Sequence, residues 1–181
     1  MRRVVVSSME IQSNDEADFR QVYQTVFPML MKVVYHITNN QDLAEEICQE
    51  AFIRYYDKAM SFPSEDEAKY WLIRVSKNLA INQVKRKARE IGMVEKLKKF
   101  PDTSPIKDGA QALVEQETRK EVQSAIASLP EKFRLVIVMK EYTDMDYKEI
   151  AKTLHISESN VKVRVYRARK MLEEALGPKR E

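Results

Sequence analysis

The chain has 181 residues, which is enough for one or two small domains. Its 44% apolar content suits a soluble chain, while 33% charged residues and three glycines indicate a mostly helical protein. A net charge of +3 excludes a uniformly basic or uniformly acidic protein surface. Residues 42–67 are strongly acidic, whereas residues 85–99 and the last predicted helix are basic, which favours two kinds of partner surface.

Composition also disfavours several kinds of site. Cys48 is the only cysteine, so a disulfide or a cysteine-based zinc site is excluded, and we expect a small core residue. We find no glycine-rich phosphate loop, metal-ligand cluster or nucleophile–base pair, which predicts a non-enzymatic protein without metal or cofactor. No apolar run is long enough to span a membrane, and residues 2–6 are too short for a secretory leader, so we expect a cytoplasmic protein.

The first elements are an irregular N-terminus and a long helix. Residues 1–14 carry no periodic pattern, and we expect them to be flexible. Apolar residues then recur at helical spacing over residues 15–38. Pro28 lies inside this stretch and is expected to kink or split the helix.

A second helix is predicted over residues 42–59. One arc is apolar, whereas the other presents Glu45, Glu46, Gln49 and Glu50 together with the apolar Ile53 and Tyr56. An acidic surface interrupted by apolar side chains is typical of a protein-docking face. A simple solvated acidic face is the alternative.

A third helix is predicted over residues 65–89, after a loop that contains Ser61 and Phe62. Leu72, Val75 and Leu79 form its core line. The other side mixes aromatic, amide and cationic side chains: Tyr70, Trp71, Arg74, Lys77, Asn78, Asn82 and Lys85. Rings stack on bases and cations follow phosphates, so this face favours an unpaired nucleic-acid strand. Either ring could instead belong to the core.

Residues 91–114 are predicted to be a linker, because proline, glycine and aspartate break the periodicity there. Helix resumes from about residue 113 to 128, and Pro130 begins another helix. The fold class is therefore all-α, with two small helical domains joined by a flexible linker.

The last stretch, residues 146–178, has the pattern of a helix-turn-helix. Asp146 and Glu149 form a capping-box pattern, Ser157 can cap the second helix, and Gly177 can end it. The left-handed conformation expected at His155 costs about 1 kcal/mol. On the second helix an apolar stripe faces the first helix, and the opposite arc carries Ser159, Lys162, Val163, Tyr166, Arg167 and Lys170. This arc is suited to the major groove, although a plain amphipathic helix with a solvated basic face is the alternative.

Together, these patterns resemble the sigma-70 family of bacterial RNA polymerase initiation factors. The chain is most similar to the extracytoplasmic function (ECF) group, which retains sigma regions 2 and 4. The resemblance covers about residues 15–90 and 115–177. Its motifs are DLAEEICQEAFIRYY, YWLIRVSKNLAINQVKRK, LPEKFRLVIVMKEY and YKEIAKTLHISESNVKVRVYRARKML.

The resemblance implies a polymerase contact on the second helix. In the family this helix docks on the beta-prime clamp helices, and region 4 contacts the beta flap of the core enzyme. The matching positions, with the outward-facing Ile53 added, are Asp42, Glu45, Glu46, Gln49, Glu50, Ile53 and Arg54. Phe52 also matches the family pattern, but it lies nearer the buried arc.

The resemblance also implies two DNA contacts. Region 2 of the family captures and opens the single-stranded −10 element, which places Ser61, Phe62, Arg74, Lys77, Asn78, Asn82, Lys85 and Arg86 at that strand. Many relatives carry Asp where this chain has Asn82. Region 4 reads the double-stranded −35 element, which places the outward arc of the last helix, from Ser159 to Lys170, in the major groove.

The implied function is a sigma factor for a stress or envelope response, held by an anti-sigma factor that is often membrane-bound. Residues 15–90 would be region 2, residues 115–177 region 4, and residues 178–181 a tail. One rival is a helix-turn-helix regulator that binds an operator as a dimer, and another is an adaptor that binds polymerase without selecting promoters. Footprints with and without core enzyme would separate the three.

Overall fold

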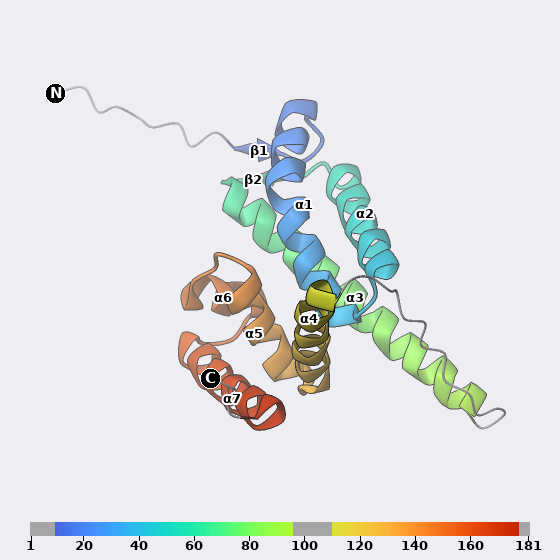
Figure 1. Cartoon of the computed structure of the whole chain (residues 1–181). Helices are drawn as coiled ribbons and strands as arrows, with labels where there is room; N and C mark the ends of the chain where they lie inside the picture. Colours follow the sequence, from blue (N-terminus) through green and yellow to red (C-terminus); the bar gives the residue numbers. More distant parts are fainter. Residues whose placement is uncertain (1–9, 96–109, 178–181) are drawn as a thin grey trace.

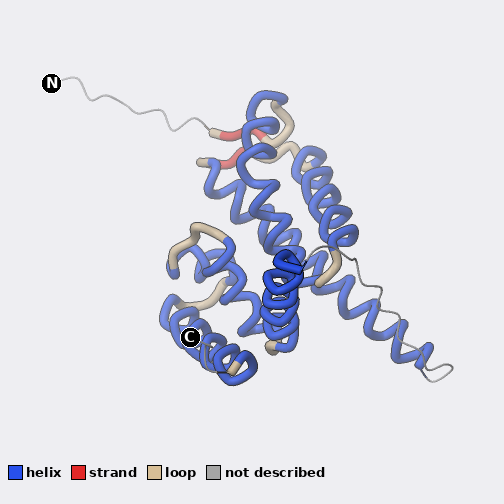
Figure 2. The backbone as a smooth tube through the Cα atoms, in the orientation of Figure 1, coloured by secondary structure: helices blue, strands red, loops and turns tan. Residues whose placement is uncertain are grey.

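The structure, a computed structural model, describes residues 10–95 and 110–177, with side chains described for residues 10–90 and 118–177. Seven helices and one two-stranded sheet occur in these ranges, and helices dominate the path of the chain (Figures 1 and 2). The all-α prediction is therefore confirmed apart from this small sheet. The predicted linker is shorter at both ends, because α3 extends to Glu95 and α4 begins at Ala110; its remainder lies outside the described residues.

The N-terminal half is built from three helices, α1 (Glu16–Thr38), α2 (Gln41–Asp57) and α3 (Glu65–Glu95), and α1 packs against both others. Asp15 caps α1 by accepting hydrogen bonds from the backbone of Ala17 and Asp18. Pro28 does not split α1. Its side chain lies on the exposed face, so water can satisfy the carbonyl that loses its donor, while buried neighbours hold the helix.

The expectation of a wholly flexible N-terminus is wrong at its last residues. Strand β1 (Ile11–Gln12) pairs antiparallel with β2 (Ser61–Phe62), and Ile11 is buried. The buried Ser13 donates its backbone N–H to the Met60 carbonyl at 2.9 Å. These pairings join residues about fifty positions apart, so local periodicity does not reveal them. Residues 1–9 lie outside the described residues.

The C-terminal half contains α4 (Ala110–Ser128), α5 (Glu131–Tyr142), α6 (Tyr147–Leu154) and α7 (Glu158–Leu176). The capping box of Asp146 and Glu149 is present, with both bonds at 2.7 Å. His155 has φ 54° and ends α6 in the left-handed conformation, as expected. Helix α7 packs against α5 and α6, and its buried residues are Val161, Val165 and Ala168. The predicted helix-turn-helix is confirmed.

The two halves pack against each other. Helix α1 contacts α4 and α5, and α3 contacts α6. Figure 1 shows α4 to α7 gathered on one side of the α1–α2–α3 group. Buried residues of both halves belong to one continuous apolar cluster.

Candidate functional site

Helix α7 presents its outward arc to solvent. All six predicted reading residues are exposed, including Val163 at 48% and Tyr166 at 68%: Ser159, Lys162, Val163, Tyr166, Arg167 and Lys170. An aromatic ring left so exposed gains little from packing in this state, so it is available to a partner. Lys162 forms an ion pair with Glu158 at 2.7 Å, and that hydrogen bond raises the pKa of Lys162.

Neighbouring elements fix the position of α7. Ser157 caps its first turn, and the backbone N–H of Ile156 bonds to the Ala151 carbonyl at 3.0 Å, which closes the turn. Arg169 forms an ion pair with Glu141 of α5 at 2.8 Å, and this contact raises the pKa of Arg169. The arc is therefore presented by a helix that is capped at its first turn and paired with α5 through Arg169.

Helix α2 carries the predicted docking face. Asp42, Glu45, Glu46, Gln49, Ile53 and Arg54 are exposed, and Glu50 is half-buried. Two contacts within the helix order this face, because Gln49 donates to Glu45 at 3.2 Å and Arg54 pairs with Glu50 at 2.6 Å. Ile53 is 56% exposed in the middle of these polar groups. Phe52 is buried, which agrees with its place near the buried arc.

Beside this face lies an apolar hollow of about 420 Å³, which the sequence analysis missed. Its lining includes Phe19 and Tyr23 of α1 and Ile53 and Tyr56 of α2. The rings of Phe19 and Tyr56 meet edge to face at 5.6 Å between centroids. Ile53 and Tyr56 on the outward arc were the available sequence signal, but the contribution of α1 depends on tertiary packing.

The face of α3 is only partly free. Asn78, Asn82, Lys85 and Arg86 are exposed, whereas Arg74 and Lys77 are half-buried. Burial lowers the pKa of Lys77. Ser61 is exposed on β2, but Phe62 is buried and stacks on Tyr55 at 5.5 Å between centroids. Phe62 therefore offers no surface to a DNA strand in this arrangement.

The two aromatic residues at the start of α3 serve packing. Tyr70 is 6% exposed, and Trp71 is half-buried with its ring 6.0 Å from that of Tyr55. The Tyr70 hydroxyl donates to the Glu149 carboxylate at 2.6 Å, across the boundary between the halves. Burial, followed by this bond, raises the pKa of Tyr70. In this arrangement the core alternative holds for Tyr70.

We call the contact between the halves the seam. On the α3 side it contains Tyr70–Glu149, an Arg74–His155 bond of 2.8 Å, a Glu67–Lys152 ion pair, and a Lys85–Glu131 pair at 3.4 Å. Four residues of α3 therefore bond to α5, α6 and the turn after it. The seam engages Arg74 and Lys85, two of the residues predicted to contact DNA.

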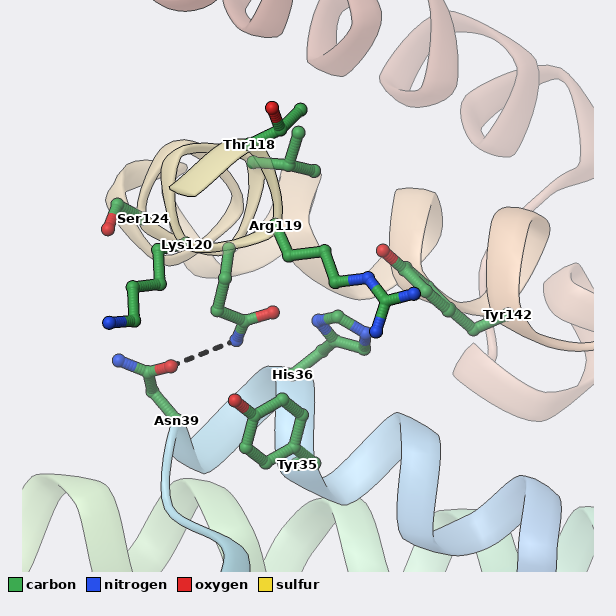
Figure 3. Close-up of a pocket in the computed structure, with 10 residues that line it drawn as sticks. Tyr35, His36, Asn39, Thr118, Arg119, Lys120, Ser124 and Tyr142 are labelled. Atoms are coloured by element: carbon green, nitrogen blue, oxygen red, sulfur yellow. Dashed lines mark hydrogen bonds between the residues drawn. The ribbon is translucent and has the colours of Figure 1, made fainter. Parts of the chain in front are cut away.

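The other side of the seam joins the end of α1 to α4 and α5. The His36 ring lies 3.8 Å from that of Tyr142 between centroids, and Gln123 donates to Asn39 at 3.0 Å. A cavity of about 740 Å³ opens beside them, and Figure 3 shows Arg119 reaching from α4 toward His36 and Tyr142. Sequence analysis gave no role to these residues.

The described residues include no cluster of three or more His, Cys, Asp or Glu side chains suited to a metal ion. No helix among them has the length and apolarity needed to cross a membrane. Cys48 is buried as expected, and burial raises its pKa to about 12.

Comparison with known families gives two matches along the chain. A family model described as Sigma-70 region 2 matches residues 22–90, and one described as Sigma-70, region 4 matches residues 119–172. The ECF RNA polymerase sigma factor SigW of Bacillus subtilis is 30% identical over 176 residues, with 92% of this chain and 93% of that protein covered. The two matches contain the α2–α3 surfaces and the α7 arc.

Solved structures share the fold. The sigma factor RpoE from Bartonella quintana, in complex with the anti-sigma factor NepR, aligns with a TM-score of 0.68 at 22% identity, covering 90% of this chain and 99% of that one. CnrH, in complex with the cytosolic domain of CnrY, aligns with a TM-score of 0.65 at 20% identity, covering 91% and 90% of the two chains.

Proposed function

We propose a working mechanism for this chain from one premise: it belongs to the ECF group of the sigma-70 family, whose members are transcription initiation factors rather than enzymes. In this mechanism the chain binds core polymerase through α2, holds a melted −10 strand on α3, and reads duplex −35 DNA with α7. The observation that carries the proposal is the similarity to SigW over nearly the whole chain, combined with the full exposure of the α7 arc.

The α2 face and the adjacent apolar hollow are the proposed site for the beta-prime clamp helices. Acidic side chains around an exposed isoleucine provide a polar rim and an apolar centre, which is the usual composition of a protein interface. A cleft of about 350 Å³ lined by Glu46, Gln49 and Ile53 connects this face to α3. Polymerase bound here would lie next to the strand-binding helix.

A charge-reversal pair tests the polymerase site. We expect Glu46→Lys with Gln49→Lys to abolish binding to sigma-free core enzyme in a pull-down, because cations would replace the polar rim. The matched control is Glu121→Lys with Gln24→Lys, which makes the same change in charge at exposed positions outside the face. Equal binding by both double variants would exclude α2 as the docking helix.

The α7 arc is proposed to read the −35 element. Arg167 and Lys170 supply cationic donors, and exposed Val163 offers an apolar contact suited to a thymine methyl group. Tyr147 of α6 lies between Lys140 and Lys162, whose ammonium groups are 5.4 and 6.0 Å from its ring centroid. These lysines would place two positive charges beside the phosphate backbone.

Strand capture by α3 requires the seam to open in this mechanism, because Arg74 and Lys85 bond to the C-terminal half. An anti-sigma factor is a proposed further partner, since both solved relatives above are complexes, one with NepR and one with CnrY. We further propose that the chain acts in the cytoplasm and that its anti-sigma factor can hold it at the membrane.

The decisive experiment adds the purified chain to sigma-free core polymerase and a genomic promoter library, and sequences the run-off transcripts. A sigma factor gives transcripts from a shared promoter motif only when both components are present. DNA protection by the chain alone on palindromic sites, without any effect on core enzyme, would instead establish the dimeric regulator. Polymerase binding without promoter-specific transcripts would establish the adaptor.

A further inference from the structure

The cavity of about 740 Å³ on the α1 side of the seam is lined by side chains of α1, α4 and α5. None of its lining residues belongs to the surfaces proposed to contact polymerase or DNA. Because α1 is in the N-terminal half and α4 and α5 are in the C-terminal half, the cavity is complete only while the halves are joined. Its volume lies within the range of about 300–1,000 Å³ that is typical of small-molecule sites.

Three ring side chains line this cavity. Tyr35 and His36 come from α1, and Tyr142 comes from α5. The centroid of the His36 ring lies 3.8 Å from that of Tyr142 and 5.5 Å from that of Tyr35. Tyr35 and Tyr142 are only half-buried, so part of each ring remains open to a ligand. Such rings favour a planar aromatic group, which can stack on them or meet their edges.

Two cations of α4 also line the cavity. Arg119 and Lys120 form no ion pair with any described residue, and the lining contains no Asp or Glu side chain. Figure 3 shows the Arg119 guanidinium beside the imidazole of His36 and the ring of Tyr142. A guanidinium binds a phosphate or carboxylate group through two parallel hydrogen bonds. The cavity therefore combines an aromatic wall with a site for an anion.

Carboxylates in the adjoining hollow do not cancel this positive charge. That hollow shares Arg119 with the cavity and adds Lys32, Glu141 and Asp144. Glu141 is already paired with Arg169 at 2.8 Å. Lys32 offsets Asp144, so the charges of Arg119 and Lys120 remain uncompensated by the groups around the two hollows.

His36 contributes a buried polar atom that has no partner. The residue is 8% exposed, and its Nδ1 makes no hydrogen bond to any described residue. A buried polar atom left unpaired is costly, so a ligand that bonds to it is favoured. The amides of Asn39 and Gln123, which bond to each other at 3.0 Å, also line the cavity. These groups suit the polar edge of a heterocyclic base.

We propose that this cavity binds a free nucleotide, with the phosphates on Arg119 and Lys120 and the base against the rings of α1 and α5. Nδ1 of His36 bonds to the polar edge of the base. A nucleotide bound in this way contacts both halves of the chain and holds the seam closed. The site requires neither polymerase nor promoter DNA, so it does not depend on the function proposed above.

The effect on the seam follows from linkage. Separation of the halves divides the site, so the nucleotide binds the closed arrangement and not the open one. A ligand with this preference lowers the opening constant by about a hundredfold when its concentration is about a hundred times its Kd. The nucleotide would thus reduce the population in which Arg74 and Lys85 of α3 are released from the C-terminal half.

Isothermal titration calorimetry on the full chain tests the site. The probes are ADP, GDP, CDP and UDP, the corresponding nucleosides, inorganic pyrophosphate, and a short single-stranded DNA. We expect at least one nucleoside diphosphate to bind with one molecule per chain. Its nucleoside and pyrophosphate should each bind about tenfold more weakly or less, because each lacks the bonds to one set of groups. Equal binding of pyrophosphate, binding of the DNA alone, or no binding of any diphosphate would overturn the proposal.

Two variants locate the binding. Arg119→Ala should weaken nucleotide binding by about tenfold, because it removes a charged donor, and its exposed position spares the fold. His36→Phe keeps a ring against Tyr142 but removes Nδ1, and should also weaken binding. Arg20→Ala is the matched control, since Arg20 is an exposed arginine of α1 outside the cavity. Equal losses in Arg119→Ala and Arg20→Ala, with unchanged urea midpoints, would reduce the effect to net charge and overturn the site.

Single-molecule FRET on the full chain tests the effect on the seam. Dyes are attached at Asp57→Cys on α2 and Glu174→Cys on α7, both exposed positions, while buried Cys48 stays unlabelled. At a urea concentration where open and closed populations are both present, the nucleotide should decrease the low-transfer population, and Arg119→Ala should abolish this response. Nucleotide binding without any change in that population would contradict a site shared by the two halves. Failure of run-off transcription alongside intact nucleotide binding would reject the sigma function and leave the site standing.

Discussion

The two helices proposed to contact DNA differ in how the fold presents them. Helix α7 exposes every predicted reading residue, while its buried stripe is fixed on α5 and α6. Helix α3 has two of its predicted contacts, Arg74 and Lys85, bonded across the seam, and Phe62 lies in the core. The α7 arc is exposed and can contact duplex DNA directly. The α3 face can contact a DNA strand with all of its predicted residues only after the seam opens.

A helix face whose composition suits DNA is therefore not always exposed to a partner. The arc of α7 stays exposed because the buried stripe on the opposite face of the helix makes its packing contacts with α5 and α6. Helix α3 is 31 residues long and contacts the C-terminal half through residues from Glu67 to Lys85, while Asn78 and Asn82 remain exposed.

Two valines of α7 should separate folding from recognition. Val165→Asp would bury an unpaired charge and should cost roughly 4 kcal/mol of unfolding free energy, measured by urea denaturation. Val163→Asp, two residues earlier and 48% exposed, should change stability by less than about 0.5 kcal/mol while weakening duplex binding. Similar destabilisation by both changes would contradict the assigned orientation of α7.

Removal of one hydroxyl should free α3. Tyr70→Phe deletes the donor to the Glu149 carboxylate, and bonds to charged groups contribute about 1.5–3 kcal/mol. The opening constant of the seam should therefore rise about tenfold to a hundredfold, measured by single-molecule FRET on the full chain between dyes on α2 and α7. Tyr147→Phe is the matched control, because no hydrogen bond of its hydroxyl is found among the described residues. An unchanged opening constant would show that this bond does not hold the seam.

The two DNA surfaces should also differ in what they read. Arg167→Ala should relax selectivity at one −35 base pair by about 1–3 kcal/mol, measured on a randomised promoter library. Lys85→Ala should instead weaken binding uniformly across sequences and reduce the salt dependence by about one phosphate contact. A sequence-selective effect of Lys85→Ala would reverse the roles assigned to the two helices.

Left-handed residues offer the smallest test. Ala59 has φ 46° and His155 has φ 54°, and each strained position costs an L-residue about 1 kcal/mol. Ala59→Gly should raise the urea midpoint slightly without changing the seam. His155→Gly should relieve similar strain within the helix-turn-helix but loosen the seam by removing the bond to Arg74. Equal FRET behaviour of the two variants would argue against a structural role for that bond.

Much of the architecture follows from local chemistry. The capping residues Asp146 and Ser157 and the periodic apolar stripes locate helix starts and buried helix faces without reference to distant contacts. The exposed arc of α7 was correctly predicted because a surface helix on a small domain has only one buried side. Its role in reading DNA stays a prediction until binding is measured.

Other features depend on pairings that no local pattern records. The β1–β2 pair, the apolar hollow between α1 and α2, and the burial of Phe62 all join residues distant in sequence. The seam also joins residues distant in sequence. Tyr70 bonds to Glu149, Arg74 bonds to His155, and His36 stacks on Tyr142. Periodicity determines which side of a helix is apolar, whereas only tertiary packing decides which polar side chains are covered, since that depends on how separate helices meet in space.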